Sequence, residues 1–429
     1  MNKYKQINLT KGGKLFYVKN KINNSTMVRI AFDCGSRCDT IPGLAHFVEH
    51  VFFSGTKTMS RDDINKKYFN FIGSNASTSN GDICFRASLF TKEFEEYVKT
   101  VAMIVTETTF EQKELDKEIG IVQQEIAREK DKHNRNAGRL NRLMLTQLPF
   151  YEDYDSLGTE ESVATIKQKD VVEFVKKYFV ANNLRVYVTS PLRLGKVKKI
   201  IERELVSKLT VDPEFEKLPY FISYVKDTTF KKLETKDINK NYIMVNFNNP
   251  HTIYDFEYRA KAGLVLDMIN DFSTGLLKIM REERSLVYSG SVYTELRNDK
   301  ETLISFYTEC ATKNVNPVLE TLSEYIQKIA KEGFTEEQLK QAKRMTKYNH
   351  ETSEPRLGRL LFKLTDFETF GKIIRNDISK LMKKVTLEEC NEIFKEMFLH
   401  NQISYTIYGS IKKEELISDE KFDELFKNN

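Results

Sequence analysis

Two histidines four positions apart, with a glutamate between them, form the cluster in this chain that is best suited to chemistry. They are His46, Glu49 and His50, in a chain of 429 residues that contains six histidines. Residues four apart lie on one face of a helix, so both imidazoles can reach one metal ion. Glu49 stands beside them without having to be a ligand, where a carboxylate can act as a base. The pattern predicts a metal site with a general base attached.

The same residues also fit a structural interpretation, in which two histidines of a partly buried helix bond to backbone or carboxylate groups. The neighbouring sequence favours the metal site. Gly35-Ser36-Arg37 and Gly43-Leu44-Ala45 precede the two histidines, and Phe53-Ser54-Gly55-Thr56 follows them. This run resembles the pitrilysin, insulin-degrading enzyme and mitochondrial processing peptidase family. In that family the His-x-x-Glu-His order is inverted relative to thermolysin-like enzymes, hence the name inverzincins.

A third metal ligand must come from elsewhere, because catalytic zinc usually takes three protein ligands and leaves a fourth position for water. Glu118 and Glu125 lie two turns apart in a Lys/Glu-rich stretch, 111–148, that predicts a helix. Taken alone, this pair favours an ordinary solvated helix face. The resemblance implies that Glu125 is the third ligand of one zinc ion per chain, with Glu129 as the alternative. It also implies that Glu118 orients a histidine ligand.

Peptide hydrolysis without a covalent intermediate is the reaction that the resemblance implies. Zinc polarises the scissile carbonyl and lowers the pKa of its water, and Glu49 takes the water's proton and later protonates the leaving amine. The remaining histidines lack a paired ligand, and we interpret them as structural. They are His133, His251, His350 and His400.

A polar segment, 73–79, comes before the predicted strand 82–87. Its composition alone favours a loop. In the resembled family the matching Asn-Ala segment is a sheet edge beside the zinc, and the substrate pairs with it as an added strand. The resemblance therefore implies that Asn75 and Ala76 bind peptide substrates, largely through backbone atoms.

Arg281 and Tyr288, seven positions apart, lie in the second half of the chain. By themselves they fit a helix that ends in a strand, with solvated charges and a packed tyrosine. The resembled family uses an Arg and a Tyr at this spacing to hold substrate and to hydrogen-bond the carbonyl oxygen as it becomes tetrahedral. We therefore predict a catalytic role for both residues, with Arg284 and Tyr293 as neighbouring candidates.

An internal repeat predicts two similar domains. Residues 174–188 and 393–407, 219 positions later, both read as a helix followed by a strand, and the strand 27–32 has a counterpart at 242–247. We expect a boundary between positions 208 and 225, where Asp-Pro and Leu-Pro pairs interrupt the periodicity. The N-terminal domain, 1–215, would bind metal and be catalytic. The C-terminal domain, 216–429, would be homologous, lack metal ligands and contribute its Arg and Tyr to a facing active site.

The expected fold class is α+β, with two homologous α/β-roll domains that each carry a mostly antiparallel sheet covered by helices. Near the metal site we expect strands at 13–19 and 26–33, a metal-binding helix at 43–54 and a second helix at 60–72 that begins with a capping box at Ser60. In the resembled family four such domains form a clamshell chamber, and this chain supplies one half. We therefore expect a homodimer, with a heterodimer with a homologous subunit as the alternative.

Composition limits the expected partners, the cellular compartment and the state of the cysteines. The chain is 40% hydrophobic and 30% charged, its net charge is +5, and basic and acidic residues are interspersed, so we expect no nucleic-acid partner. The N-terminal residues Met1–Gln6 form no apolar leader, and no apolar run is long enough to span a membrane, so we expect a cytoplasmic protein. Five cysteines fit reduced thiols, and we interpret Cys34 and Cys38 as packing residues or free thiols.

Three functions remain open at this point. The first is a zinc endopeptidase that hydrolyses short, unstructured peptides inside a dimeric chamber. The second is the catalytic subunit of a heteromeric processing peptidase that matures a specific precursor peptide. The third is a non-catalytic scaffold or binding subunit, against which the intact metal motif argues.

Overall fold

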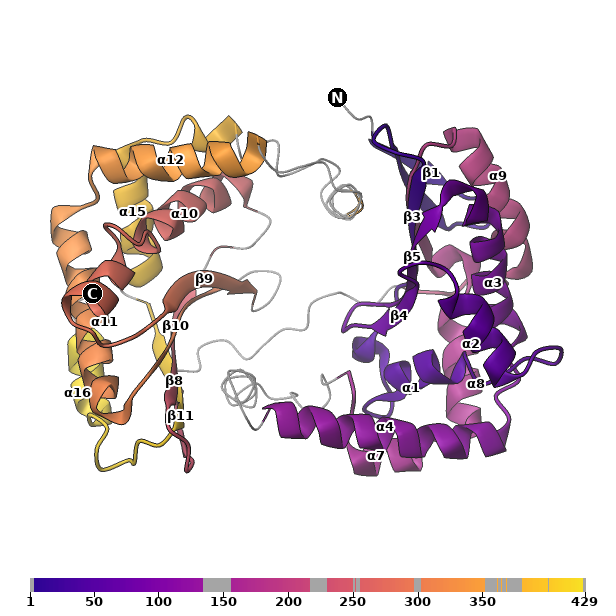
Figure 1. Ribbon diagram of the computed structural model, residues 1–429, viewed down its shortest axis with the longest axis horizontal. Helices are drawn as coiled ribbons and strands as arrows, with labels where there is room; N and C mark the ends of the chain where they lie inside the picture. Colours follow the sequence, from indigo (N-terminus) through magenta and orange to yellow (C-terminus); the bar gives the residue numbers. More distant parts are fainter. Residues whose placement is uncertain are drawn as a thin grey trace. The chain divides into compact units, whose positions relative to one another are not determined.

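The computed structural model describes residues 4–133, 156–216, 230–249, 251, 255–296, 302–351, 380–399 and 401–426, together with Leu361, Leu364 and Glu368. These residues form two compact units. The first unit contains the described residues up to 130, those from 156 to 216, and the three single residues. The second unit contains the described residues from 230 to 351 and from 380 to 426, together with 131–133 at the end of a helix of the first unit. In Figure 1 the first unit is drawn mainly in indigo and magenta, and the second mainly in orange and yellow.

The first unit is built on a mixed sheet with the strand order β1-β2-β6-β3-β5-β4. β2 and β6 run parallel, whereas the other neighbouring strands are antiparallel. β4 therefore lies at one edge of this sheet. The strands are β1 (Tyr4–Asn8), β2 (Lys14–Lys19), β3 (Ser25–Phe32), β4 (Asn75–Thr78), β5 (Ile83–Phe90) and β6 (Leu184–Ser190).

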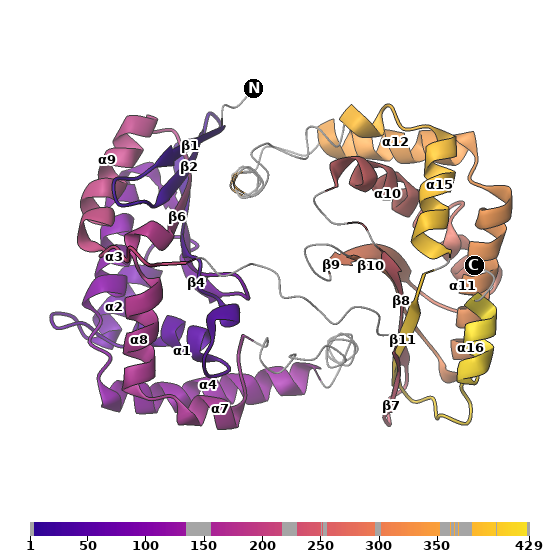
Figure 2. The ribbon, with the colours of Figure 1, turned by 180° about the vertical axis from the view of Figure 1, so that it is seen from behind.

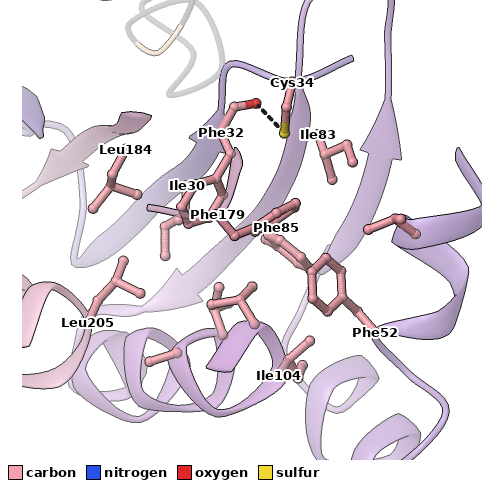
Figure 3. Packing of buried hydrophobic residues seen from close by; sticks show 14 of the residues in the cluster. Ile30, Phe32, Cys34, Phe52, Ile83, Phe85, Ile104, Phe179, Leu184 and Leu205 are labelled. Atoms are coloured by element: carbon pink, nitrogen blue, oxygen red, sulfur yellow. Dashed lines mark hydrogen bonds between the residues drawn. The ribbon is translucent and has the colours of Figure 1, made fainter. Parts of the chain in front are cut away.

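Helices cover one face of this sheet (Figures 1 and 2). Alternate residues of β3, Val28, Ile30 and Phe32, point into the apolar core between sheet and helices. Phe52, just after α1, packs against Phe85 and Phe179 with ring centroids 6.1 and 4.7 Å away (Figure 3). The helices are α1 (Leu44–Val51), α2 (Arg61–Phe69), α3 (Phe94–Glu107), α4 (Gln112–His133), α7 (Glu160–Thr165), α8 (Gln168–Tyr178) and α9 (Leu194–Glu204).

The opposite face of the same sheet is covered by residues from far along the chain. Leu361, Leu364 and Glu368 are spaced as one side of a helix. Leu364 is fully buried in a cluster with strand residues, and Leu361 packs against that cluster. Glu368 accepts hydrogen bonds from Arg185 Nε at 3.1 Å and from the hydroxyl of Tyr187. The strand residues of this cluster are Phe16, Val18, Ala31, Cys84 and Tyr187.

The second unit repeats the strand arrangement of the first. Its sheet has the order β7-β11-β8-β10-β9, which matches β2-β6-β3-β5-β4 strand for strand, including one parallel pair. This repetition confirms the expected fold class, with two homologous, mostly antiparallel α/β units. The strands are β7 (Lys231–Thr235), β8 (Asn241–Asn249), β9 (Gly290–Leu296), β10 (Thr302–Cys310) and β11 (Ile403–Gly409).

Helices also cover one face of the second sheet, and α11, α15 and α16 lie on the same side of it in both ribbon views (Figures 1 and 2). Phe247 of β8 packs against Phe398 and Phe426, which joins the sheet to two of these helices. The helices are α10 (Phe256–Ile269), the π-helix η5 (Lys278–Glu283), α11 (Val315–Glu332), α12 (Glu336–Glu351), α15 (Leu387–Phe398) and α16 (Asp419–Phe426). Short 3₁₀ turns span Ser36–Cys38, Thr91–Glu93, Ala181–Asn183, Val206–Lys208 and Thr312–Asn314.

The predicted elements around the metal motif agree with these bounds to within a few residues at their ends. The expected strand 82–87 is β5, and the segment 75–78 is the edge strand β4, as the resemblance implied and the composition alone did not. The predicted helix 111–148 begins as α4, and its part beyond His133 lies outside the described residues. The boundary between 215 and 216 stays a prediction, because 217–229 also lie outside them. Among the described residues, no helix is both long and apolar enough to cross a bilayer.

Candidate metal centre

Helix α1 is anchored at its first turn by Asp39. The carboxylate of Asp39 accepts the backbone N–H of Gly43 at 2.9 Å and that of Ala45 at 2.8 Å. Burial raises the pKa of Asp39 to about 7, against the effect of these backbone hydrogen bonds. Gly43 has a φ of 89°, in the left-handed region that favours glycine. The start of the helix is therefore fixed by one capping side chain and one glycine.

The apolar residues of α1 decide which way its histidines point. Leu44, Phe47 and Val51 are buried in the core of the first unit. His46 and His50 then share another face, and their ring centroids lie 4.6 Å apart. The predicted helical spacing therefore brings the two imidazoles together.

Helix α4 supplies the carboxylates that meet these histidines. Its buried residues Leu115, Val122 and Ile126 pack into the core. On the same helix, Glu125 places Oε2 3.4 Å from His50 Nε2 and 3.9 Å from His46 Nε2. One ligand atom from each of these three residues lies within 4.8 Å of the other two.

Glu129, the alternative ligand, is not part of this cluster among the described residues. Its carboxylate lies 3.4 Å from Arg128 Nη2. The geometry therefore favours Glu125 over Glu129 as the third ligand.

Glu118 fixes the orientation of His50. Its Oε1 lies 3.0 Å from His50 Nδ1, and a hydrogen bond from this nitrogen would leave Nε2 to bind a metal ion. Without a metal, the carboxylates of Glu118, Glu49 and Glu125 raise the pKa of His50 against the effect of burial. Burial by itself would raise the pKa of Glu118, but hydrogen bonds from His50 and Arg61 outweigh it and lower that pKa. Glu118 therefore stays ionised, which is the state that orients a histidine ligand.

The donor set fits a zinc ion. Burial lowers the pKa of His46 to about 3, so that its imidazole is neutral and offers a lone pair. Two imidazole nitrogens and one carboxylate oxygen thus converge, as the ligands of a metal ion do. Two histidines and one glutamate are also a protein ligand set of catalytic zinc, with a fourth position left for water.

Glu49 is held beside this cluster by β4. Its Oε2 accepts the hydroxyl of Thr78 at 2.7 Å. Burial raises the pKa of Glu49, and the hydrogen bonds from Thr78 oppose this effect. On β4 itself, Asn75 is exposed and Ala76 is partly buried, and the Asn75 carbonyl accepts the hydroxyl of Tyr68 at 2.9 Å.

Three residues of the site were missed by the sequence analysis. Asp39 caps α1, Thr78 bonds to Glu49, and Arg61 donates to Glu118 at 2.6 Å and to Glu114 at 3.0 Å. Signals for two of them were present. An aspartate precedes the start of α1, and Arg61 follows a Ser N-cap at the first position of α2. The partner of Thr78 depends on how a strand and a helix pack, which local sequence does not carry.

Arg281 and Tyr288 come together within the second unit. The guanidinium carbon of Arg281 lies 4.9 Å from the ring centroid of Tyr288, and its Nε lies 3.1 Å from Glu282. Tyr288 is 74% exposed, so its hydroxyl is open to solvent in this unit. Nearby, Arg284 is paired with Glu324 at 2.6 Å, and Tyr293 lies on β9. The catalytic role of these residues stays a prediction.

The five cysteines are free and buried, as expected for packing residues. Burial raises the pKa of Cys38 to about 11 and also raises that of Cys34. A thiol with a raised pKa is a poor nucleophile. Neither Cys34 nor Cys38 belongs to the ligand cluster found among the described residues.

Two family profiles match this sequence. Residues 15–147 match the insulinase family, peptidase family M16, and residues 165–346 match the M16 inactive domain. The chain therefore belongs to the M16 peptidases, a family of zinc proteases. The ligand cluster lies within the first match, and the second unit provides most of the second match.

The relatives of this chain include bacterial and mitochondrial proteins. The uncharacterized zinc protease YmxG of Bacillus subtilis is 24% identical over 394 residues, which cover 88% of each chain. The mitochondrial-processing peptidase subunit beta of Blastocladiella emersonii is 29% identical over 163 residues, covering 37% of this chain and 34% of the relative. The first half of the periplasmic protease PqqL from Escherichia coli has the same fold, with a TM-score of 0.83 at 18% identity and coverage of 99% and 96%.

Proposed function

We propose that this chain is a zinc endopeptidase that hydrolyses short, unstructured peptides. The observation that carries this proposal is the convergence of His46, His50 and Glu125 beside the carboxylate of Glu49. These three ligands would hold one zinc ion per chain. Zinc, when bound, supplies a Lewis acid that polarises a peptide carbonyl and lowers the pKa of water.

Glu49 is the general base in this proposal. Its carboxylate takes the proton of the attacking water and returns it to the leaving amine, so that one group serves both steps. Glu118 keeps Nε2 of His50 turned toward the ligand cluster. No covalent bond between protein and substrate is needed, and no nucleophilic serine or cysteine enters the reaction.

Substrate would bind as an added strand on β4. This strand lies at the edge of its sheet, and Asn75 and Ala76 form its first half. An extended peptide can pair with the backbone of such an edge, whatever its side chains are. This mode of binding predicts a loose sequence preference and a requirement for an unfolded segment.

We further propose that two copies form a closed chamber. The chain covers 50% of full-length PqqL, whose first half alone matches nearly its whole length. A homodimer would supply the other half, and Arg281 and Tyr288 of one copy would serve the zinc site of the other. The hydroxyl of Tyr288 would then donate a hydrogen bond to the carbonyl oxygen of the substrate as the carbonyl carbon becomes tetrahedral.

We also propose that the protein acts in the cytoplasm.

The test is mass spectrometry of a panel of unstructured peptides incubated with the zinc-loaded protein. Cleavage is expected in the wild type and should be lost with a chelator and with Glu49→Gln. Glu129→Gln is the matched control, because Glu129 lies one turn beyond Glu125 on α4 and is paired with Arg128. Cleavage that survives both the chelator and Glu49→Gln would contradict the proposal.

The second candidate is the catalytic subunit of a heteromeric processing peptidase. The similarity to the mitochondrial-processing peptidase subunit beta favours it. A zinc-loaded wild type that cleaves only after a homologous subunit is added would support this candidate. A non-catalytic binding subunit, which the match to an inactive domain would fit, predicts no cleavage under either condition.

A further inference from the structure

The free edge of β4 is defined by the hairpin that joins it to β5. Ser79 N donates to the carbonyl of Asp82 at 2.9 Å, which makes this a hydrogen-bonded pair. In an antiparallel ladder such pairs alternate with pairs that turn their backbone groups outward. The register Thr78↔Ile83 and Ala76↔Phe85 therefore directs the N–H and C=O groups of Thr78 and Ala76 away from β5.

The side chains of the same two residues face the helices. Ala76 packs against the core between sheet and helices, whereas Ser77 lies 3.2 Å from Cys84, which belongs to the cluster on the opposite face. Because strand residues alternate between faces, Thr78 shares the face of Ala76. Thr78 thus presents its hydroxyl on the side of α1, while its N–H points outward from the edge.

Glu49 accepts the hydroxyl of Thr78. This hydroxyl donates to Glu49 Oε2 at 2.7 Å. The side chain of Thr78, at the end of the edge, is therefore bound to the base. The outward groups of Ala76, two residues before it, face the side on which an added strand would pair.

We infer that Thr78 is a positioning residue that fastens the Glu49 carboxylate to the edge of β4. This inference rests on the proposed function, because it assigns Glu49 as the base and β4 as the edge that binds substrate. A peptide paired with Ala76 then lies at a fixed separation from the base. Thr78 sets which bond of the peptide is cleaved relative to the pairing register, and it keeps the carboxylate aimed at the attacking water.

The test compares Thr78→Val, Thr78→Ser and Thr189→Val in the zinc-loaded full chain. Valine keeps the shape of threonine and removes the hydroxyl, whereas serine keeps the hydroxyl. Thr189 is the matched control, since it is a buried threonine on β6 whose hydroxyl lacks a hydrogen-bond partner among the described residues. Zinc content, kcat and KM are measured for each variant with one peptide.

We expect Thr78→Val to lower kcat about tenfold or more, because it removes a hydrogen bond to a charged group. KM, zinc content and the rates of Thr78→Ser and Thr189→Val should stay near their wild-type values. A wild-type kcat in Thr78→Val would overturn the inference. Loss of zinc in proportion to the loss of kcat would also overturn it, because Thr78 would then only support the metal site.

Crystal structures of the wild type and of Thr78→Val provide a measurement that needs no activity. The inference expects the Glu49 carboxylate to leave its wild-type position relative to β4 in the variant. An unchanged Glu49 side chain would overturn it. If the wild type cleaves no peptide, the proposed function fails, while this structural comparison still decides whether Thr78 holds Glu49.

Discussion

Two of the groups that would act on zinc or on substrate, His50 and Glu49, are each held by a second residue behind them. His50 is oriented by Glu118, which is itself paired with Arg61 at 2.6 Å, and Glu49 is held by Thr78. Such partners fix the direction of a lone pair, and their loss typically weakens a metal site about 10- to 100-fold. The chemistry at this scale therefore depends on residues that never touch the substrate.

Arg61→Met tests the contact of Arg61 with Glu118, the residue that orients His50. We expect zinc affinity to fall about tenfold, because Glu118 loses one charged partner and holds His50 less firmly. Isothermal titration with zinc measures the change. Lys67→Met is the control, since Lys67 on the same helix α2 forms an exposed ion pair with Glu96. Equal effects of the two substitutions would contradict this role of Arg61.

Glu125→Gln tests the third ligand. Zinc affinity should fall by more than tenfold, because a carboxylate oxygen is replaced by a neutral amide. Glu129→Gln should leave it within about twofold, since Glu129 stays outside the cluster. Competition with a chromogenic chelator gives both constants. The opposite ranking would make Glu129 the ligand.

The helices bring these residues together only if the first turn of each helix is fixed in position. In α1, Gly43 fixes it. A Cβ added at Gly43 would lie 2.6 Å from the carbonyl oxygen of Leu157, and the φ of 89° disfavours any other residue. Gly120 on α4 has nothing within 4 Å of such an atom. The two glycines therefore predict opposite outcomes for the same substitution.

Gly43→Ala should destabilise the fold by about 1–3 kcal/mol through backbone strain and collision. Gly120→Ala should stabilise it by about 0.5–1 kcal/mol, because alanine is the better helix former. Urea unfolding of both variants and the wild type measures the free energies. Destabilisation by Gly120→Ala would show that α4 has less room there than the structure indicates.

Asp39 predicts a dependence of stability on pH. Burial raises its pKa to about 7 in the folded state, whereas an aspartate in the unfolded chain titrates near 4. The folded protein therefore binds the proton more tightly, and this contribution to stability is lost as the pH rises from about 4 through 7. It amounts to about 1.4 kcal/mol per unit of pKa difference.

Asp39→Asn removes this titration. The free energy of unfolding at pH 5 minus that at pH 8 should be smaller in the variant than in the wild type. Urea unfolding at the two pH values gives the difference. An unchanged difference would mean that Asp39 has the same pKa in the folded and unfolded states.

The elements near the metal motif could be predicted because local signals define them. The helix that carries His46 and His50 and the helix start at Ser60 were both predicted correctly. The repeated helix and strand at 174–188 and 393–407 were also predicted correctly. The polar composition of 73–79 favoured a loop, but pairing with β5 makes residues 75–78 a strand. Thr78 was missed for the same reason, since its partner is set by tertiary packing and not by neighbouring residues.

At the scale of the whole molecule, the two units repeat one strand order, but the ligand cluster found among the described residues lies in the first. A homodimer would give each metal site an arginine and a tyrosine from the other copy. This arrangement predicts that two differently inactivated chains, combined in one dimer, recover peptidase activity.

Glu49→Gln and Tyr288→Phe provide this test. Each homodimer should be nearly inactive. When the two chains are co-expressed, half of the dimers are mixed, and one of the two sites in each mixed dimer has both groups intact. About a quarter of wild-type activity should return. Activity no higher than that of the single variants would place Glu49 and Tyr288 of one chain at the same site, or Tyr288 outside it.

Leu361, Leu364 and Glu368 close one face of the first sheet, although they follow its last strand, β6, by more than 170 positions. On the ribosome this sheet is therefore synthesised long before its cover. At about 5–20 residues per second, the interval lasts on the order of ten seconds. During that time Phe16, Ala31 and Tyr187 lack their final neighbours. We therefore expect the nascent first unit to need protection by chaperones, and a fragment that stops at residue 216 to keep that need.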